Sequence, residues 1–159
     1  MIAIGDQIPN VTLKTPTADG IKDISTHDLF RGKKAVLFAV PGAFTPTCSD
    51  DHLPSYTALA DDLKAKGIEL VVCTAVNDAH VLRSWSKARN ADGLVQMLAD
   101  GNGDFARAVG LEVDLAKAGM GLRSRRYAMV LDDGVVRYLV VEPAPGVTVS
   151  GAAAVVAAL

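Results

Sequence analysis

The sequence is poor in the features that mark several classes of protein. Only two of its 159 residues are cysteines, and aromatic residues make up 5% of the chain. Two cysteines cannot build a disulfide framework, which fits a reducing compartment, so we expect a cytoplasmic protein. The formal net charge of −2 gives no basis for binding nucleic acid or an anionic membrane surface. The one basic cluster, residues 123–126, is too short to change that expectation.

Signals for targeting, membrane insertion and metal binding are also missing. No charged segment followed by an apolar run stands at the start, so we expect no signal peptide. The apolar segment 151–159 is too short to cross a bilayer. His27 and His80 lie in unrelated segments, so we expect neither a metal centre nor another cofactor. The remaining composition, 50% hydrophobic and 21% charged, fits one globular domain.

One stretch organises the chain. Residues 35–40 are continuously apolar and end at a Pro-Gly pair, which predicts a fully buried strand of a parallel or mixed sheet. After the turn, Thr45 is a good helix N-cap and Pro46 suits the first helical position. Apolar residues then recur at helical spacing until Gly67 provides a stop. This count places Cys48 in the first turn of the predicted helix.

The position of Cys48 suits thiolate chemistry. Unpaired N–H groups and the positive end of the helix dipole surround a sulfur there, and both favour thiolate over thiol. The alternative is an inert cysteine, because most free cysteines are small buried hydrophobes. Polar neighbours favour the reactive interpretation, but Asp50 and Asp51 oppose a thiolate, so a cation must come from elsewhere in the fold.

The rest of the chain predicts alternating strands and helices. Strands are expected at 68–76, 95–100, 127–131 and 135–141, with helices at 78–89 and 104–109 between them. Asp-Gly pairs predict hairpin turns at residues 19–20 and 132–134, the first joining short strands near 11–13 and 21–24. Further expected features are a helical turn capped by Thr26, a break at Pro54 and a last helix capped by Ser150. Within 111–125, which has no clear pattern, residues 119–121 predict a surface loop that can follow a helical turn.

The residues around Cys48 carry a family resemblance. The run from Val40 to Ser49, Val-Pro-Gly-Ala-Phe-Thr-Pro-Thr-Cys-Ser, followed by His52-Leu53-Pro54, resembles the active-site signature of type II (peroxiredoxin-five-like) peroxiredoxins. The likeness extends over nearly the whole chain, including residues 4–6, 76–79 and 123–130. It implies a single thioredoxin-like peroxiredoxin (redoxin) domain over residues 1–159. That fold is α/β, a mixed central sheet flanked by helices, here with an N-terminal β-hairpin extension.

The resemblance also assigns chemistry to the stretch. Cys48 becomes the peroxidatic nucleophile, and Thr45 can place its hydroxyl near both the sulfur and a bound peroxide oxygen. Backbone N–H groups of the turn, from Pro41 and Gly42 to Thr47, are expected to bind the substrate and its developing negative charge. Thr45 stands where thioredoxins have the first cysteine of Cys-x-x-Cys, so dithiol exchange within this motif is excluded.

The expected cation is Arg126. A strand at 127–131 that runs antiparallel to the strand at 35–40 begins at the sheet edge where the other strand ends. An arginine at this place in the family holds the thiolate and the peroxide. Arg123 is the second candidate, although it and Arg125 fit a solvated surface pair. His52 follows Cys48 by four residues and could form a Cys–His pair, but we expect it to pack or hydrogen-bond instead.

The predicted function is a thiol-dependent peroxidase that reduces hydrogen peroxide and small alkyl hydroperoxides in antioxidant defence. Cys48 would become a sulfenic acid, and an external thiol from glutathione and glutaredoxin, or from thioredoxin, would return it to the thiol. No resolving cysteine is expected: Cys73, the only candidate, sits in an apolar strand, and the late position that carries one in some relatives holds Val149.

Two other functions remain open from the sequence. A peroxide sensor would be oxidised at Cys48 and signal to a partner with little turnover. A binding module on the same scaffold would not catalyse, which the combination of Thr45, Cys48 and Arg126 disfavours. The family also implies a homodimer, with Phe44 and residues 77–80 near the contact.

Overall fold

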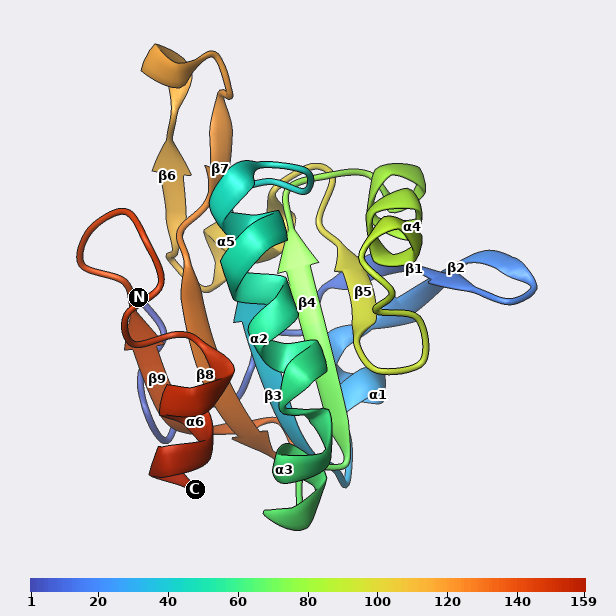
Figure 1. Ribbon diagram of the computed structural model, residues 1–159, viewed down its shortest axis with the longest axis vertical. Helices are drawn as coiled ribbons and strands as arrows, with labels where there is room; N and C mark the ends of the chain where they lie inside the picture. The colour runs from blue at the N-terminus through green and yellow to red at the C-terminus, as the bar shows by residue number, and fades with distance from the viewer.

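A seven-stranded mixed sheet forms the centre of the fold (Figure 1). The computed structural model describes residues 1–159. In spatial order the strands are β2 (Gly20–Ser25), β1 (Thr12–Thr17), β5 (Gln96–Ala99), β4 (Leu70–Ala75), β3 (Lys34–Ala39), β8 (Tyr127–Asp132) and β9 (Val135–Val141). Strands β3, β4 and β5 are parallel, and β1, β2, β8 and β9 join through antiparallel pairs.

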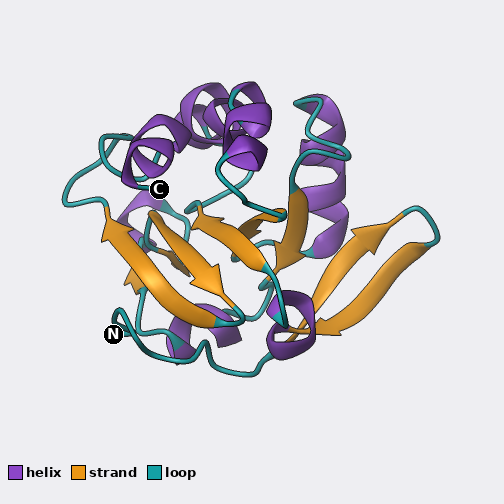
Figure 2. Cartoon of the chain, turned by 90° about the horizontal axis from the view of Figure 1, so that it is seen from below, coloured by secondary structure: helices purple, strands orange, loops and turns teal.

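Helices cover both faces of this sheet (Figure 2). On one face lie α2 (Leu53–Ala58), α3 (Ala60–Ala65), α4 (Ala79–Ala88) and α6 (Ala152–Ala158), and on the other α1 (Thr26–Phe30) and α5 (Asp104–Ala108). Strand β3 supplies both cores: Val36 and Phe38 pack toward the first set of helices, Ala35 and Leu37 toward the second. Burial on both faces explains why its sequence is continuously apolar.

The predicted thioredoxin-like fold with an N-terminal hairpin is confirmed. Strands β1 and β2 close on a turn at Ala18 and Asp19, and β1 pairs with β5, so the hairpin extends the central sheet. The β8–β9 turn has positive φ at both central residues, Asp133 (51°) and Gly134 (78°), as a type I′ turn requires. No helix is long and apolar enough to cross a membrane.

The helix that carries Cys48 differs from the single helix predicted. Residues 46–47 are α-helical, a π-helical turn, η1 (Cys48–His52), follows, and α2 begins at Leu53, whose N–H donates to the Cys48 carbonyl five residues earlier. Pro54 has no N–H for the carbonyl four residues before it, so the regular pattern must break near this point, as predicted. A second break at Leu59 was not predicted, and the segment ends at Gly67 (φ 89°) as expected.

Two other local predictions were wrong, and a third was incomplete. The N-cap of α1 is Ser25, whose hydroxyl accepts from the Asp28 N–H, because the Thr26 hydroxyl donates to the Pro9 carbonyl. The N-cap of α6 is Gly151, and Ser150 instead turns its hydroxyl toward Glu142. Residues 111–125 form a projecting hairpin, β6 (Glu112–Asp114) and β7 (Leu122–Ser124), around a 3-10 turn, η2 (Ala116–Ala118) (Figure 1). Three-residue strands are too short to show a periodic pattern.

Candidate active site

The site lies at the carboxyl end of β3. The register of the antiparallel β3–β8 pair matches Ala39 with Tyr127, so Arg126 comes before the first residue of β8 at the edge where β3 ends. This is the placement that the sequence predicted. The Arg126 Nη2 donates to the Cys48 Sγ at 3.1 Å, across 78 residues of sequence. A guanidinium therefore stands beside the sulfur and offers the positive charge that Asp50 and Asp51 require.

The second guanidinium nitrogen of Arg126 is held by His52. Arg126 Nη1 lies 2.8 Å from His52 Nδ1, and His52 Nε2 lies 3.0 Å from the Ser150 carbonyl oxygen. A carbonyl only accepts, so Nε2 carries the imidazole hydrogen and Nδ1 accepts from the arginine. Burial lowers the pKa of His52 to about 4, which keeps the ring neutral and this hydrogen-bond pattern intact near pH 7. His52 thus orients Arg126, consistent with the predicted hydrogen-bonding role.

In the loop before Cys48, the side chain of Thr45 folds back toward Gly42. The Thr45 hydroxyl donates to the Gly42 carbonyl at 2.7 Å. The predicted side-chain N-cap by Thr45 is wrong: its hydroxyl oxygen accepts from no backbone N–H of the helix start, and the one hydrogen bond of this side chain is its donation to Gly42. The hydroxyl oxygen keeps its acceptor lone pairs. The N–H groups of Thr47 and Cys48 donate to no backbone carbonyl, since the helix begins just before them.

Cys48 itself is fully buried. Its neighbour Ser49 accepts a hydrogen bond at 2.9 Å from the indole N–H of Trp85 on α4, which ties the π-helical turn to the next helix. Trp85 is the only tryptophan of the chain and is also buried, as predicted for a core residue. The other predicted substrate-binding residues line the loop: Gly42 is buried, and Pro41 and Thr47 are half-buried.

Arg123 is not the solvated residue expected of it. Its Nε donates to the Met120 carbonyl at 2.9 Å, and its Nη1 lies 3.4 Å from the carbonyl oxygens of Pro41 and Val76. The arginine thus joins the β6–β7 hairpin to the ends of β3 and β4, and it contacts the loop rather than the Cys48 sulfur. Arg125 is exposed, as predicted.

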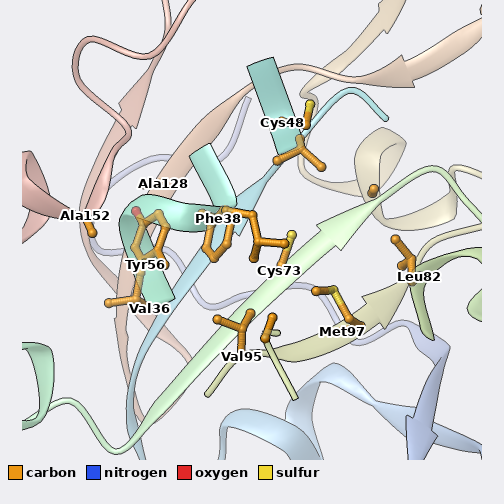
Figure 3. Packing of buried hydrophobic residues seen from close by; sticks show 14 of the residues in the cluster. Val36, Phe38, Cys48, Tyr56, Cys73, Leu82, Val95, Met97, Ala128 and Ala152 are labelled. Carbon is orange, nitrogen blue, oxygen red and sulfur yellow. The ribbon is translucent and has the colours of Figure 1, made fainter. Parts of the chain in front are cut away.

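Cys73 is buried in β4, as its apolar surroundings predicted. It pairs in register with Phe38 and shares the apolar cluster that also contains Cys48, at whose edge Cys48 lies (Figure 3). Both cysteines are free thiols. Burial, followed by the nearby Cys48, raises the pKa of Cys73 well above its usual value, so its thiol is a poor nucleophile.

The structure also identifies site residues that the sequence did not single out. Tyr56 stacks on Phe38 and donates its hydroxyl to the same Ser150 carbonyl, at 2.7 Å, that accepts from His52. Glu142 accepts hydrogen bonds from Thr148, Val149 and Ser150. The only available sequence signal was a carboxylate six to eight residues before a Thr-Val-Ser run in a Pro-Gly loop, and this pattern has no fixed structural meaning.

A hollow of the protein lies away from this site. It has a volume of about 830 Å³ and lies between α3, α4 and the starts of β4 and β5, with Lys64, Arg83 and Lys87 at its margin. None of the residues around Cys48 lines it. This hollow is therefore separate from the candidate site in the loop after β3.

Known proteins share both the fold and the sequence. The family profile described as Redoxin matches residues 3–156. Peroxiredoxin-2E-2, chloroplastic, of Oryza sativa subsp. japonica is 47% identical over 163 residues, 99% of this chain and 72% of the rice protein. Peroxiredoxin-2B of Arabidopsis thaliana is 43% identical over 159 residues, 99% of this chain and 98% of the plant protein. The crystal structure of reduced Prx3 in complex with H₂O₂ from Vibrio vulnificus superposes with a TM-score of 0.95 at 52% identity, covering 99% of both chains.

A thioredoxin-like fold with a cysteine beside an arginine, and without Cys-x-x-Cys, fits the class of thiol-dependent peroxidases. The matches place the chain within that class over nearly its full length. The chain belongs to the peroxiredoxin family.

Proposed function

We propose that the Cys48 thiolate reduces hydrogen peroxide and small alkyl hydroperoxides. The sulfur attacks one oxygen of the peroxide, so that an S–O bond forms while the O–O bond breaks. The sulfur is oxidised to a sulfenic acid, and the leaving oxygen is reduced and takes a proton to become water or an alcohol. The observation that carries this proposal is the 3.1 Å contact between Arg126 Nη2 and Cys48 Sγ.

The surroundings of the sulfur can stabilise the charge of the leaving oxygen and can hold the hydroperoxide. The guanidinium and the amides of Thr47 and Cys48 provide donors for charge that moves onto the leaving oxygen. The Thr45 hydroxyl oxygen can accept the hydrogen of a bound hydroperoxide. The related Vibrio vulnificus protein has been crystallised with H₂O₂. Pro41 and Gly42 shape the loop next to the peroxide.

For recycling, we propose a cycle with one cysteine. A first external thiol condenses with the sulfenic acid to give a mixed disulfide and water, and a second thiol releases the Cys48 thiol. Cys73 is buried in a central strand, and its raised pKa leaves little thiolate to attack Cys48. Val149 stands in the loop where a late resolving cysteine would be needed. Glutathione with glutaredoxin is the proposed donor, in a reducing compartment such as the cytoplasm, with thioredoxin as the alternative donor.

One experiment tests the electron donor. Steady-state peroxide consumption is compared with glutathione plus glutaredoxin, with thioredoxin plus its reductase, and with neither. We expect sustained turnover with the glutathione system, equal in wild type and Cys73→Ser. Peptide mapping after one equivalent of peroxide, without added thiol, should find no intramolecular Cys48–Cys73 disulfide. A major disulfide between them, together with lost turnover in Cys73→Ser, contradicts the one-cysteine cycle. No turnover with any donor favours the peroxide sensor.

We also propose a homodimer formed through the sheet edge that carries the site. Phe44, in the loop before Cys48, is 52% exposed, and Leu122, in the neighbouring hairpin β6–β7, is 53% exposed. Large exposed apolar side chains at one end of a molecule are typical of an interface. Sedimentation analysis should show a dimer for wild type and a shift toward monomer for Phe44→Asp, and a monomeric wild type would contradict this proposal.

A further inference from the structure

Glu142 does not contact Cys48 but is linked to Arg126 in two ways. Through the backbone, the Glu142 N–H donates to the Arg126 carbonyl at 2.9 Å. Through its side chain, the Oε2 atom accepts from the Ser150 N–H at 2.8 Å and from the Ser150 hydroxyl at 2.6 Å. The carbonyl of the same Ser150 accepts from His52, and His52 in turn accepts from Arg126. These contacts form a closed ring that includes the arginine beside Cys48.

The loop is built to hold this carboxylate. The Thr148 hydroxyl donates to Oε1 at 2.6 Å, and the N–H groups of Thr148 and Val149 also donate to the carboxylate. Glu142 is only 7% exposed and forms no salt bridge, so its charge is balanced by these donors alone. Burial by itself would raise its pKa, but the hydroxyl groups of Ser150 and Thr148 and the amides of Val149 and Ser150 outweigh it and lower the pKa to about 2.

A fixed anion at this place has a consequence for the arginine. Ser150 is completely buried, and its N–H and C=O point to different partners, Glu142 on one side and the pair His52 and Tyr56 on the other. The carboxylate holds Ser150 by its N–H and by its hydroxyl, on two sides of the Cα that carries the carbonyl, and this double contact in a buried residue restrains the direction of the carbonyl. The carbonyl direction sets the tautomer and tilt of the His52 ring, and the ring sets the position of Arg126 Nη1.

We propose that Glu142 is a positioning residue for the peroxide-reducing step, acting through Ser150 and His52 to hold the Arg126 guanidinium against the Cys48 sulfur. This proposal rests on the function of Cys48 proposed above. A purely structural Glu142 would stabilise the loop without influencing the rate of Cys48 oxidation or the state of the His52 ring.

The test compares Glu142→Gln with Thr148→Val as a matched control. The control removes a 2.6 Å hydrogen bond from the same carboxylate but leaves both Ser150 contacts in place. The second-order rate constant for oxidation by H₂O₂ is followed through the fluorescence of the single tryptophan, Trp85. We expect a loss of about tenfold in Glu142→Gln and less than twofold in Thr148→Val, with similar losses of melting temperature. Equal rate constants in the two variants overturn the proposal.

A second measurement does not depend on activity. The ¹⁵N shifts of the His52 ring, assigned with His52→Gln among only three histidines, report its tautomer. Wild type and Thr148→Val should show the pure Nε2–H form, and Glu142→Gln a mixture. An unchanged ring in Glu142→Gln overturns the proposal even if Cys48 proves not to be the peroxidatic residue, so the two failures are distinguishable. Should Glu142→Gln not fold, Ser150→Ala, which removes the 2.6 Å bond to Oε2, replaces it with the same expected results.

Discussion

Replacing Arg126 by lysine separates the charge of this side chain from its geometry. The guanidinium uses two nitrogens at once, Nη2 on Cys48 Sγ at 3.1 Å and Nη1 on His52 Nδ1 at 2.8 Å. A lysine has one nitrogen and can keep only one of the two contacts while preserving the positive charge. The variant therefore tests whether the rate of Cys48 oxidation depends on both contacts of the guanidinium or only on its positive charge.

The expected magnitude follows from the lost contacts. Removing one oriented donor from a reacting centre costs roughly 10²–10³ in rate, and the retained charge sets our expectation for Arg126→Lys at the lower end, about 10² or roughly 2.7 kcal/mol. If the lysine stays on the sulfur, the buried His52 Nδ1 loses its donor, which costs about 1–3 kcal/mol of folding stability.

The assay is a stopped-flow measurement of Trp85 fluorescence at increasing H₂O₂ concentration, with urea unfolding as the measure of stability. Arg125→Lys is the matched control, because Arg125 is exposed, and it should change neither quantity. Arg123→Lys should lower the free energy of unfolding, because its contacts to the carbonyls of Pro41 and Val76 are lost. It should change the rate constant less than Arg126→Lys does. A larger rate effect in Arg123→Lys than in Arg126→Lys, or a change below twofold in Arg126→Lys, would show that the two contacts of Arg126 do not support the reaction.

Three further predictions concern the surroundings of the site. Gly42→Ala should lower activity, because a Cβ there would lie 3.1 Å from Arg123 Nη1 and 3.2 Å from Thr45 Cγ2, and crystal structures with peroxidase assays check it. Tyr56→Phe should cost about 1 kcal/mol in urea unfolding, since the stacking on Phe38 stays and only the bond to the Ser150 carbonyl is lost. Folding stability should fall as the pH drops. His52, with its pKa lowered to about 4, contributes stability that is fully present above pH 6.5 and lost between pH 6.5 and 4, on the order of 3 kcal/mol. Glu142, with its pKa lowered to about 2, contributes stability that is lost only between pH 4.5 and 2. Urea midpoints in His52→Gln should therefore be flatter between pH 6.5 and 4, and an unchanged slope would contradict the assigned burial of a neutral ring.

The parts of the site that the sequence predicted are those set by strands and by one local turn. The apolar run 35–40 had to be a strand buried on both faces, and the hairpin after Arg126 fixed which sheet edge that arginine occupies. Together these placed Arg126 beside Cys48 from pairing rules alone. The buried position of Cys73 followed from its apolar strand in the same way.

The parts of the site that the sequence did not predict depend on hydrogen bonds made by loop residues. Arg123 was expected at the surface because no pattern in residues 111–125 predicted a hairpin. The β6–β7 hairpin is what brings Arg123 to the Pro41 carbonyl. Thr45 was assigned a cap by residue type, but its side chain turns back to donate to the Gly42 carbonyl and accepts from no N–H of the helix. The contacts of Glu142 within residues 142–150 have no periodicity, so neither helical nor strand spacing indicates them.

We propose that the sulfur of Cys48 is the atom that reduces peroxide, and the other proposals for the site depend on this assignment. It is tested most directly by counting the peroxide that the protein consumes without any reductant, in wild type, Cys73→Ser and Cys48→Ser. We expect one equivalent of peroxide to be consumed per chain in wild type and Cys73→Ser, with a sulfenic acid trapped at Cys48, and none above background in Cys48→Ser. A Cys48→Ser variant that consumes peroxide at more than a tenth of the wild-type rate, a difference of less than roughly 1.4 kcal/mol in barrier, would contradict it.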